Sequence, residues 1–210
     1  MFPTVEVRWF FKGVVPAEVG EWFRSHGVEA EEQPARVDHY LRIVEGDFLG
    51  IKLREGRFEV KQRYGQQTIV RFGSQTEGCV EQWRKWSFEL AQTSDIDAVL
   101  NGDSSKWISI KKNRKIHTFC GIDLQPVRNL SSCGSPERGC TWEIANVKVV
   151  GSEDAWWSMG LEAFGKENEL WNTLVTVADR ILSLASAPAF KIEHSYGYPS
   201  WLQQVGQART

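Results

Sequence analysis

Apolar and polar residues alternate along many short segments of this chain, the pattern of β-strands that turn one face toward a core. Strands are predicted at residues 4–12, 36–43, 50–54, 57–63, 68–72, 79–90, 106–119, 140–150 and 155–164. Glu55-Gly56 separates two of these strands, and a Gly in such a short connection indicates a tight hairpin. A polar loop or a short helix is expected at residues 93–105, and an exposed loop at residues 129–139.

Two helices are predicted beside the strands. Pro16 is typical of a first helical turn, so one helix is expected after it. Apolar residues recur at spacings of three and four within residues 166–187, which makes one continuous apolar stripe, and Pro188 ends the pattern. Since no linker, internal repeat or low-complexity segment is present, residues 1–210 are predicted to form one domain. The predicted fold class is α+β and mainly antiparallel β, with a closed or nearly closed eight-stranded barrel, because closure removes exposed strand edges.

Cations occur in pairs on three of the predicted strands. The pairs are Lys52/Arg54, Lys61/Arg63 and Lys112/Arg114. Side chains two residues apart on a strand point the same way, so each pair lies on one face. Such pairs on neighbouring strands predict a basic wall suited to a polyanion such as triphosphate. An ordinary sheet with its polar face in water is the alternative interpretation. Lys111 is out of phase with Lys112 and is expected at the surface.

The overall charge limits the kind of partner. The 210 residues carry 25 Lys and Arg against 27 Asp and Glu, a formal net charge of -2. Proteins that coat nucleic acid non-specifically usually carry a large basic excess, so no nucleic-acid polymer is expected, and clustered cations in a balanced chain favour a small anionic ligand. No apolar run approaches the roughly 20 residues of a membrane-spanning helix, so no membrane association is expected.

The four cysteines show no zinc-site spacing, and the N-terminus shows no signal-peptide pattern. The protein is therefore predicted to be cytoplasmic with reduced thiols. A disulfide between Cys133 and Cys140 is left open.

An ordered set of short motifs resembles the CYTH superfamily, the triphosphate tunnel metalloenzymes. Thr4-Val5-Glu6-Val7-Arg8 looks like the family's E-x-E-x-K strand, with Thr in place of the first Glu and Arg in place of Lys. The other matching segments are Asp38-His39-Tyr40-Leu41, the three basic strands, the acidic strands around Glu143 and Glu162, and Ser195-Tyr196 through Trp201-Leu202. They follow the family order over almost the whole chain.

The resemblance implies a tunnel open at both ends, with cations on one side and metal-binding glutamates on the other. The implied phosphate-binding residues are Arg8, Lys52, Arg54, Lys61, Arg63, Lys112 and Arg114. Glu6, Glu143 and Glu162 are the implied ligands of Mg²⁺ or Mn²⁺, and Glu6 and Glu162 the implied catalytic residues. Thr4 removes one carboxylate and should weaken metal affinity. For each of these residues a salt-bridge or surface role is the alternative.

The first functional hypothesis is a metal-dependent hydrolase of inorganic or organic triphosphates, in which metal and cations neutralise charge as the phosphoanhydride breaks. The second is a catalytically impaired tunnel-fold protein that binds polyphosphate or a nucleotide. The third is adenylyl cyclase activity of the class IV type. The sequence leaves open which triphosphate is bound, the oligomeric state and the physiological role.

Overall fold

A computed structural model describes residues 1–26, 28–90, 100, 102, 104–128, 130–133 and 138–207. The strands are β1 (Phe2–Lys12), β2 (Glu31–Leu41), β3 (Leu49–Arg54), β4 (Arg57–Phe72), β5 (Thr76–Glu89), β6 (Trp107–Cys120), β7 (Gln125–Val127), β8 (Arg138–Val149) and β9 (Ala155–Gly165). The α-helices bounded within these residues are α1 (Ala17–Ser25), α3 (Leu170–Leu182) and α4 (Tyr198–Gln207). Short 3₁₀ turns lie at Ser104–Lys106, Leu130–Cys133, Glu167–Glu169 and Ile192–His194.

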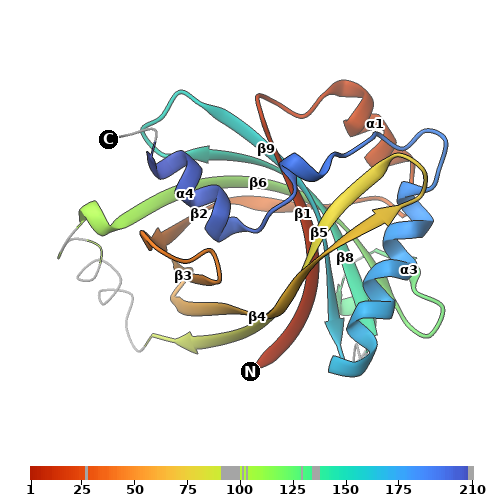
Figure 1. Ribbon diagram of the computed structural model, residues 1–210, viewed down its shortest axis with the longest axis horizontal. Coiled ribbons are helices and arrows are strands. Elements are labelled where there is room, and N and C mark those ends of the chain that lie inside the picture. The colour runs from red at the N-terminus through yellow and green to blue at the C-terminus, as the bar shows by residue number, and fades with distance from the viewer. Residues whose placement is uncertain are drawn as a thin grey trace.

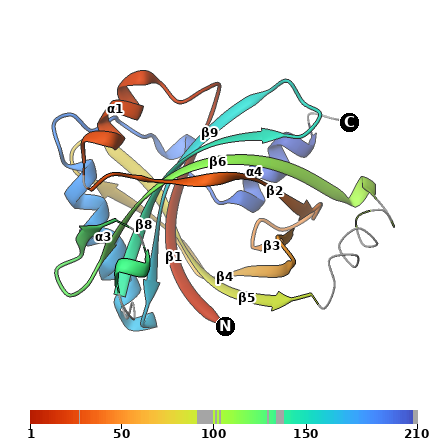
Figure 2. The same ribbon diagram turned by 180° about the vertical axis from the view of Figure 1, so that it is seen from behind.

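The strands form a closed antiparallel barrel (Figures 1 and 2). Their order is β2-β3-β4-β5-β1-β9-β8-β6, and pairing of β2 with β6 closes the ring of eight. The short β7 pairs with the end of β6, outside this ring. The predicted fold class is therefore confirmed.

Most residues of β1, β8 and β9 are buried, so both faces of these strands are largely covered. On β1, Val5, Val7 and Trp9 face outward into a large apolar core beneath α1 and α3. The outward residues of β8 and β9 belong to the same core. The alternate residues of β1 face the barrel interior, where polar and charged side chains collect.

An aromatic cluster fills the barrel interior near α4. Phe10 stacks between Tyr196 and Trp201, with ring centroids 5.6 and 5.1 Å away. Trp201 and Leu202 of α4 pack with inward-facing apolar residues of β2, β6 and β8. This part of the interior is thus filled by protein side chains, and the space that remains borders on α4, since Tyr198, Pro199 and Leu202 line it.

The structure corrects several predicted boundaries. The segments 57–63 and 68–72 belong to one strand, β4, whose register shifts between Tyr64 and Thr68. The helix expected at 166–187 is shorter, and α4 was not predicted. The tight hairpin is confirmed: Glu55 and Gly56 both have positive φ, 46° and 75°, which the Gly tolerates without steric cost. Much of the two predicted loops lies outside the described residues.

The prediction of reduced thiols was wrong for two of the four cysteines. Cys120 and Cys133 form a disulfide, with Cα atoms 6.0 Å apart, so these two thiols are not reduced in the structure. Cys140 cannot pair with Cys133 here because β8 directs its side chain into the outer apolar core, where it is fully buried. Cys79 and Cys140 are free.

Candidate functional site

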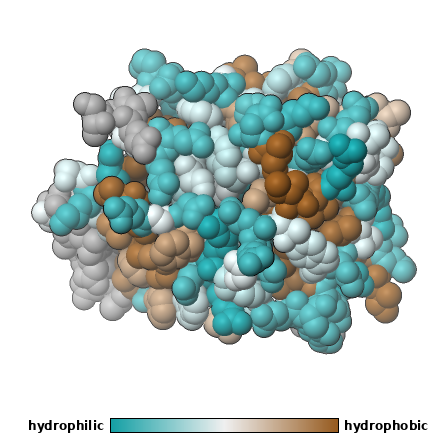
Figure 3. All heavy atoms as spheres, viewed as in Figure 1, coloured by the Kyte–Doolittle hydropathy of each residue, from teal (hydrophilic) through white to brown (hydrophobic). Residues whose placement is uncertain are grey.

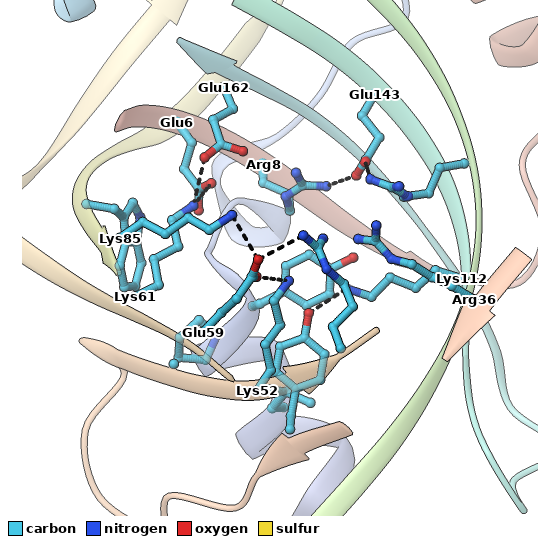
Figure 4. A pocket seen from close by; sticks show the side chains of 18 residues that line it. Glu6, Arg8, Arg36, Lys52, Glu59, Lys61, Lys85, Lys112, Glu143 and Glu162 are labelled. Atoms are coloured by element: carbon cyan, nitrogen blue, oxygen red, sulfur yellow. Dashed lines mark hydrogen bonds and ion pairs between the residues drawn. The ribbon is translucent and has the colours of Figure 1, made fainter. Parts of the chain in front are cut away.

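A charged cavity of about 160 Å³ lies inside the barrel. Figure 4 shows its side chains pointing inward from several strands toward a shared space. They converge because inward positions on neighbouring strands are every second residue, so Lys52 and Arg54 on β3 face the same interior as Glu59 and Lys61 on β4. The barrel thus gathers residues that are far apart in the sequence.

Cations outnumber carboxylates in this cavity. The eight lining cations are Arg8, Arg36, Lys52, Arg54, Lys61, Lys85, Lys112 and Arg114. The lining carboxylates are Glu6, Glu59, Glu143 and Glu162. Asp38 is fully buried against three of the cations and makes a fifth carboxylate. Eight cations against five carboxylates leave a formal excess of three positive charges, which an anion could neutralise.

Asp38 is the centre of one cluster of ion pairs. Its carboxylate lies 3.0 Å from Arg36, 3.1 Å from Lys112 and 3.6 Å from Lys52. Burial alone would raise the pKa of Asp38, but these three positive charges hold it well below its usual range. Asp38 is therefore a fixed negative charge that aligns three cations.

Glu59 is the centre of a second cluster. Its carboxylate lies 3.0 Å from Lys52, 2.8 Å from Arg54 and 3.2 Å from Lys85. Although burial opposes ionisation, these neighbours lower the pKa of Glu59 to about 2. Lys52 bridges the two clusters, since it pairs with both Asp38 and Glu59.

Glu6 and Glu162 converge on one ammonium group. Lys61 Nζ lies 2.6 Å from Glu6 Oε2 and 3.2 Å from Glu162 Oε1. Burial disfavours the charge of Glu162, but Lys61 together with Lys85 and Arg8 lowers its pKa to about 2. The two carboxylates thus share a cation that the protein itself supplies.

Glu143 is held by two arginines instead. Arg8 Nη1 lies 2.8 Å from Glu143 and Arg114 Nη1 lies 3.2 Å from it. The guanidinium of Arg8 occupies the space beside Gly160, where a Cβ atom would lie only 2.7 Å from Arg8 Cζ. Gly160 therefore provides the room for an arginine at this position.

Two of the cavity lysines have lowered pKa values. Burial lowers the pKa of Lys52 to about 7 and that of Lys112 to about 8, although Asp38 acts in the opposite direction on both. Lys112 also lies over the Tyr198 ring, 3.7 Å from its centroid, and donates a hydrogen bond to Tyr40 Oη. An anion bound at these ammonium groups would favour their charged forms.

The structure brings together most of the predicted phosphate-binding residues. Arg8, Lys52, Arg54, Lys61, Lys112 and Arg114 all line the charged cavity. Arg63 does not line it, because Arg63 forms ion pairs with Asp47 at 2.6 Å and Glu81 at 2.8 Å. Lys111 is exposed, as predicted.

The three predicted metal ligands line the same cavity but are not gathered at one point. Glu6 and Glu162 meet at Lys61, whereas Glu143 is paired with arginines. Within the described ranges, no group of three or more His, Cys, Asp or Glu side chains is arranged to hold a metal ion. The three-carboxylate site therefore does not fit this arrangement of side chains, and metal binding stays a prediction.

Sequence reasoning missed several cavity residues. Arg36, Glu59 and Lys85 were not assigned to the site, although each lines it. The signal for Glu59 was present, since it lies two residues before Lys61 on the same strand face. Lys85 could not be identified in this way, because its inward direction depends on its pairing with Lys61 across β4 and β5.

No protein-family model matches the chain, and no curated protein is significantly similar to it. Among the described residues, no helix is both long and apolar enough to cross a membrane.

Proposed function

We propose that the barrel interior binds a small polyphosphate anion, of the size and charge of triphosphate. The observation that carries this proposal is the convergence of eight cations against five carboxylates around one cavity of about 160 Å³. Membership of the CYTH superfamily remains part of the proposal and is supported by the barrel and by the six predicted cations that line the cavity.

The cavity favours a flexible anion with several oxygens over a single carboxylate. Its cations come from different strands, and the guanidinium group of arginine and the ammonium group of lysine both bind phosphate oxygens. A bound phosphate chain would compete with Asp38, Glu59 and Glu143 for cations that already form ion pairs. On binding, cations would therefore exchange a carboxylate partner for a phosphate oxygen. The excess of cations over carboxylates in the cavity favours this exchange.

Isothermal titration calorimetry of the whole protein with sodium tripolyphosphate tests this function. One saturable site per chain is expected, with an affinity that decreases as salt is added, because salt screens the attraction. Sulfate at the same ionic strength is the control and should bind more weakly, since it spans fewer of the cations. No saturable binding at millimolar tripolyphosphate would refute the proposal.

The lowered lysine pKa values predict a pH dependence of binding. Lys52, with a pKa of about 7, is half charged at neutral pH, and Lys112 loses its proton at a slightly higher pH. A polyanion binds the ammonium forms, so its affinity should fall by roughly tenfold or more between pH 7 and pH 9. Tripolyphosphate carries a weakly acidic proton on each terminal phosphate group, and loss of these protons makes the ligand more negative as the pH rises. That change would strengthen binding, so a fall in affinity can be attributed to the lysines.

Titrations at pH 7, 8 and 9 measure this dependence. The Lys52→Gln variant should show a weaker pH dependence because one titrating group is gone, whereas exposed Lys111→Gln should keep the wild-type profile. An affinity that is constant from pH 7 to pH 9 would show that the lysines do not contact the anion.

Metal-dependent triphosphate hydrolysis is the second candidate function. The observation that favours it is the approach of Glu6 and Glu162 to a common cation, Lys61. Thr4 faces the interior beside Glu6, and its Oγ1 is buried without a hydrogen-bond partner, so this position is polar but unused. Glu6 and Glu162 would hold Mg²⁺ or Mn²⁺ only if the ion displaced Lys61 Nζ from between them, and such an ion would neutralise charge on a bound phosphoanhydride.

We expect weak wild-type release of phosphate with Mn²⁺ at least as effective as Mg²⁺, and an increase with Thr4→Glu if the missing carboxylate limits activity. Glu162→Gln should abolish turnover but retain tripolyphosphate binding. A panel of tripolyphosphate, ATP and thiamine triphosphate, scored for phosphate and cyclic nucleotide, also tests the cyclase hypothesis. If tripolyphosphate binds but neither the wild type nor Thr4→Glu releases phosphate in a metal-dependent way, the hydrolase hypothesis is wrong and the protein only binds the anion.

A further inference from the structure

A second cavity, of about 210 Å³, adjoins the charged one beside α4. Its wall is mainly aliphatic and includes Leu41, Ile43, Leu49, Ile51, Ile108 and Leu202. Three residues, Gly50, Pro199 and Leu202, line both cavities. The charged cavity and this aliphatic cavity therefore share a wall formed by β3 and α4.

The aliphatic cavity has features of a binding surface. The connection between β2 and β3 contributes Val44, which is 90% exposed. In the view of Figure 3, apolar residues reach the surface near the position of β3. An exposed aliphatic side chain at the rim of an apolar cavity costs free energy in water, which an apolar ligand group would recover.

We propose that the ligand is an organic phosphate whose polyphosphate end occupies the charged cavity and whose short alkyl or isoprenyl chain occupies the aliphatic cavity. This inference rests on the proposed function, since it assigns the organic part of the same ligand. The aliphatic cavity adjoins the charged cavity, so we expect its occupant to be attached to the bound phosphate. The hydrocarbon chain would run from one cavity to the other beside Gly50, Pro199 and Leu202.

Gly50 contributes to the shape of this wall. It faces the interior in register with Lys61 on β4, and a Cβ atom added to it would lie 3.5 Å from the ring of Pro199. A side chain larger than methyl at this position would enter the space between β3 and α4. Gly50 therefore places no side chain between β3 and α4.

The wall suits a hydrocarbon better than a nucleobase. The aromatic rings that line the site, Tyr40, Trp83 and Tyr198, belong to the charged cavity, and no aromatic ring among the described residues lines the aliphatic one. A base would also require partners for several polar edge atoms, whereas Arg42 and Gln203 are the only polar side chains that the described part of the chain brings to this wall. The methylene stem of an arginine can itself cover apolar surface.

The volume sets the length of the chain. An apolar protein cavity of about 150 Å³ accommodates benzene, so about 210 Å³ has room for a group of roughly six to eight carbons. Each methylene removed from water contributes about 0.8 kcal/mol, which is about fourfold in affinity. Affinity should therefore rise with chain length and then level off.

Titration with a series of n-alkyl diphosphates, from methyl to dodecyl and below their micelle concentrations, tests this inference. The expected result is about a fourfold gain per methylene up to roughly eight carbons, followed by a plateau. Dimethylallyl and geranyl diphosphate should follow the same trend, and ATP should bind more weakly than octyl diphosphate.

A matched pair of isoleucine variants locates the effect. Ile51→Gln places a polar group in the aliphatic wall and should flatten the dependence on chain length while tripolyphosphate affinity stays unchanged. Ile69→Gln is the control, since Ile69 is 68% exposed on β4 and lines neither cavity. Circular dichroism verifies that both variants fold.

The outcomes separate this inference from the proposed function. If tripolyphosphate binds but affinity is independent of chain length, or ATP binds more tightly than octyl diphosphate, the alkyl-chain assignment is wrong and the anion site remains. If Ile51→Gln keeps the full chain-length gain, the chain binds elsewhere. If neither tripolyphosphate nor any alkyl diphosphate binds, the proposed function itself fails and the inference with it.

Discussion

Replacing Lys112 with Gln is expected to weaken tripolyphosphate binding by roughly 10- to 100-fold. A hydrogen bond to a charged group contributes about 1.5–3 kcal/mol, and Lys112 is a buried cation aimed into the cavity. Asp38 keeps Arg36 and Lys52 as partners in this variant, so the local structure should persist. Isothermal titration at pH 6.5, where the lysines are charged, measures the loss.

Lys111→Gln is the matched control for this experiment. Lys111 is the neighbouring residue on β6 but points outward into solvent, so the same chemical change should alter affinity by less than about twofold. Equal effects of the two substitutions would mean that only the overall charge of the protein attracts the anion, and would remove the role assigned to the cavity.

Asp38→Asn should destabilise the protein by about 3–5 kcal/mol at pH 6. Removing one member of a buried ion pair leaves its partners uncompensated, and here the fully buried Asp38 has three cations around it. Asp38 raises the pKa of both Lys52 and Lys112 against the effect of burial, so its loss should also lower both pKa values and disfavour the charged lysines. Urea denaturation of the variant and the wild type gives the difference in the free energy of unfolding.

Glu89→Gln serves as the control, because Glu89 is largely exposed in its pair with Arg57 and its loss should cost less than about 1 kcal/mol. Tripolyphosphate should raise the melting temperature of Asp38→Asn more than that of the wild type, since the anion would replace the missing negative charge. A variant as stable as the wild type would show that the charges around Asp38 do not depend on it.

The two-residue alternation made the barrel and most of the basic wall predictable. Lys52, Arg54, Lys112 and Arg114 could be assigned to one interior because strand geometry fixes the direction of every second side chain. The full length of β4 was not predicted. Its polar residues around Gly65 coincide with a register shift, and the alternation in the sequence does not locate such a shift. α4 was missed because its Pro199 and short length resemble a loop.

The partners of each charge required three-dimensional information. Arg63 has the same strand parity as Lys61, yet Asp47 from the β3 side and Glu81 from β5 hold it away from the cavity. Glu143 looked like a metal ligand, but its ion pairs depend on Arg8 finding room beside Gly160 on a different strand. The alternation along a strand predicts which face a charged side chain lies on. It does not predict which residue of a distant segment will form an ion pair with that side chain.

The most direct measurement is a crystal structure of the protein with tripolyphosphate. The three phosphorus atoms are expected inside the barrel, with phosphate oxygens within hydrogen-bond distance of Lys52, Lys112 and at least one of the cavity arginines. Tripolyphosphate bound only at exposed lysines outside the barrel, with the ion pairs of Asp38 and Glu59 intact around an interior that holds only solvent, would contradict it.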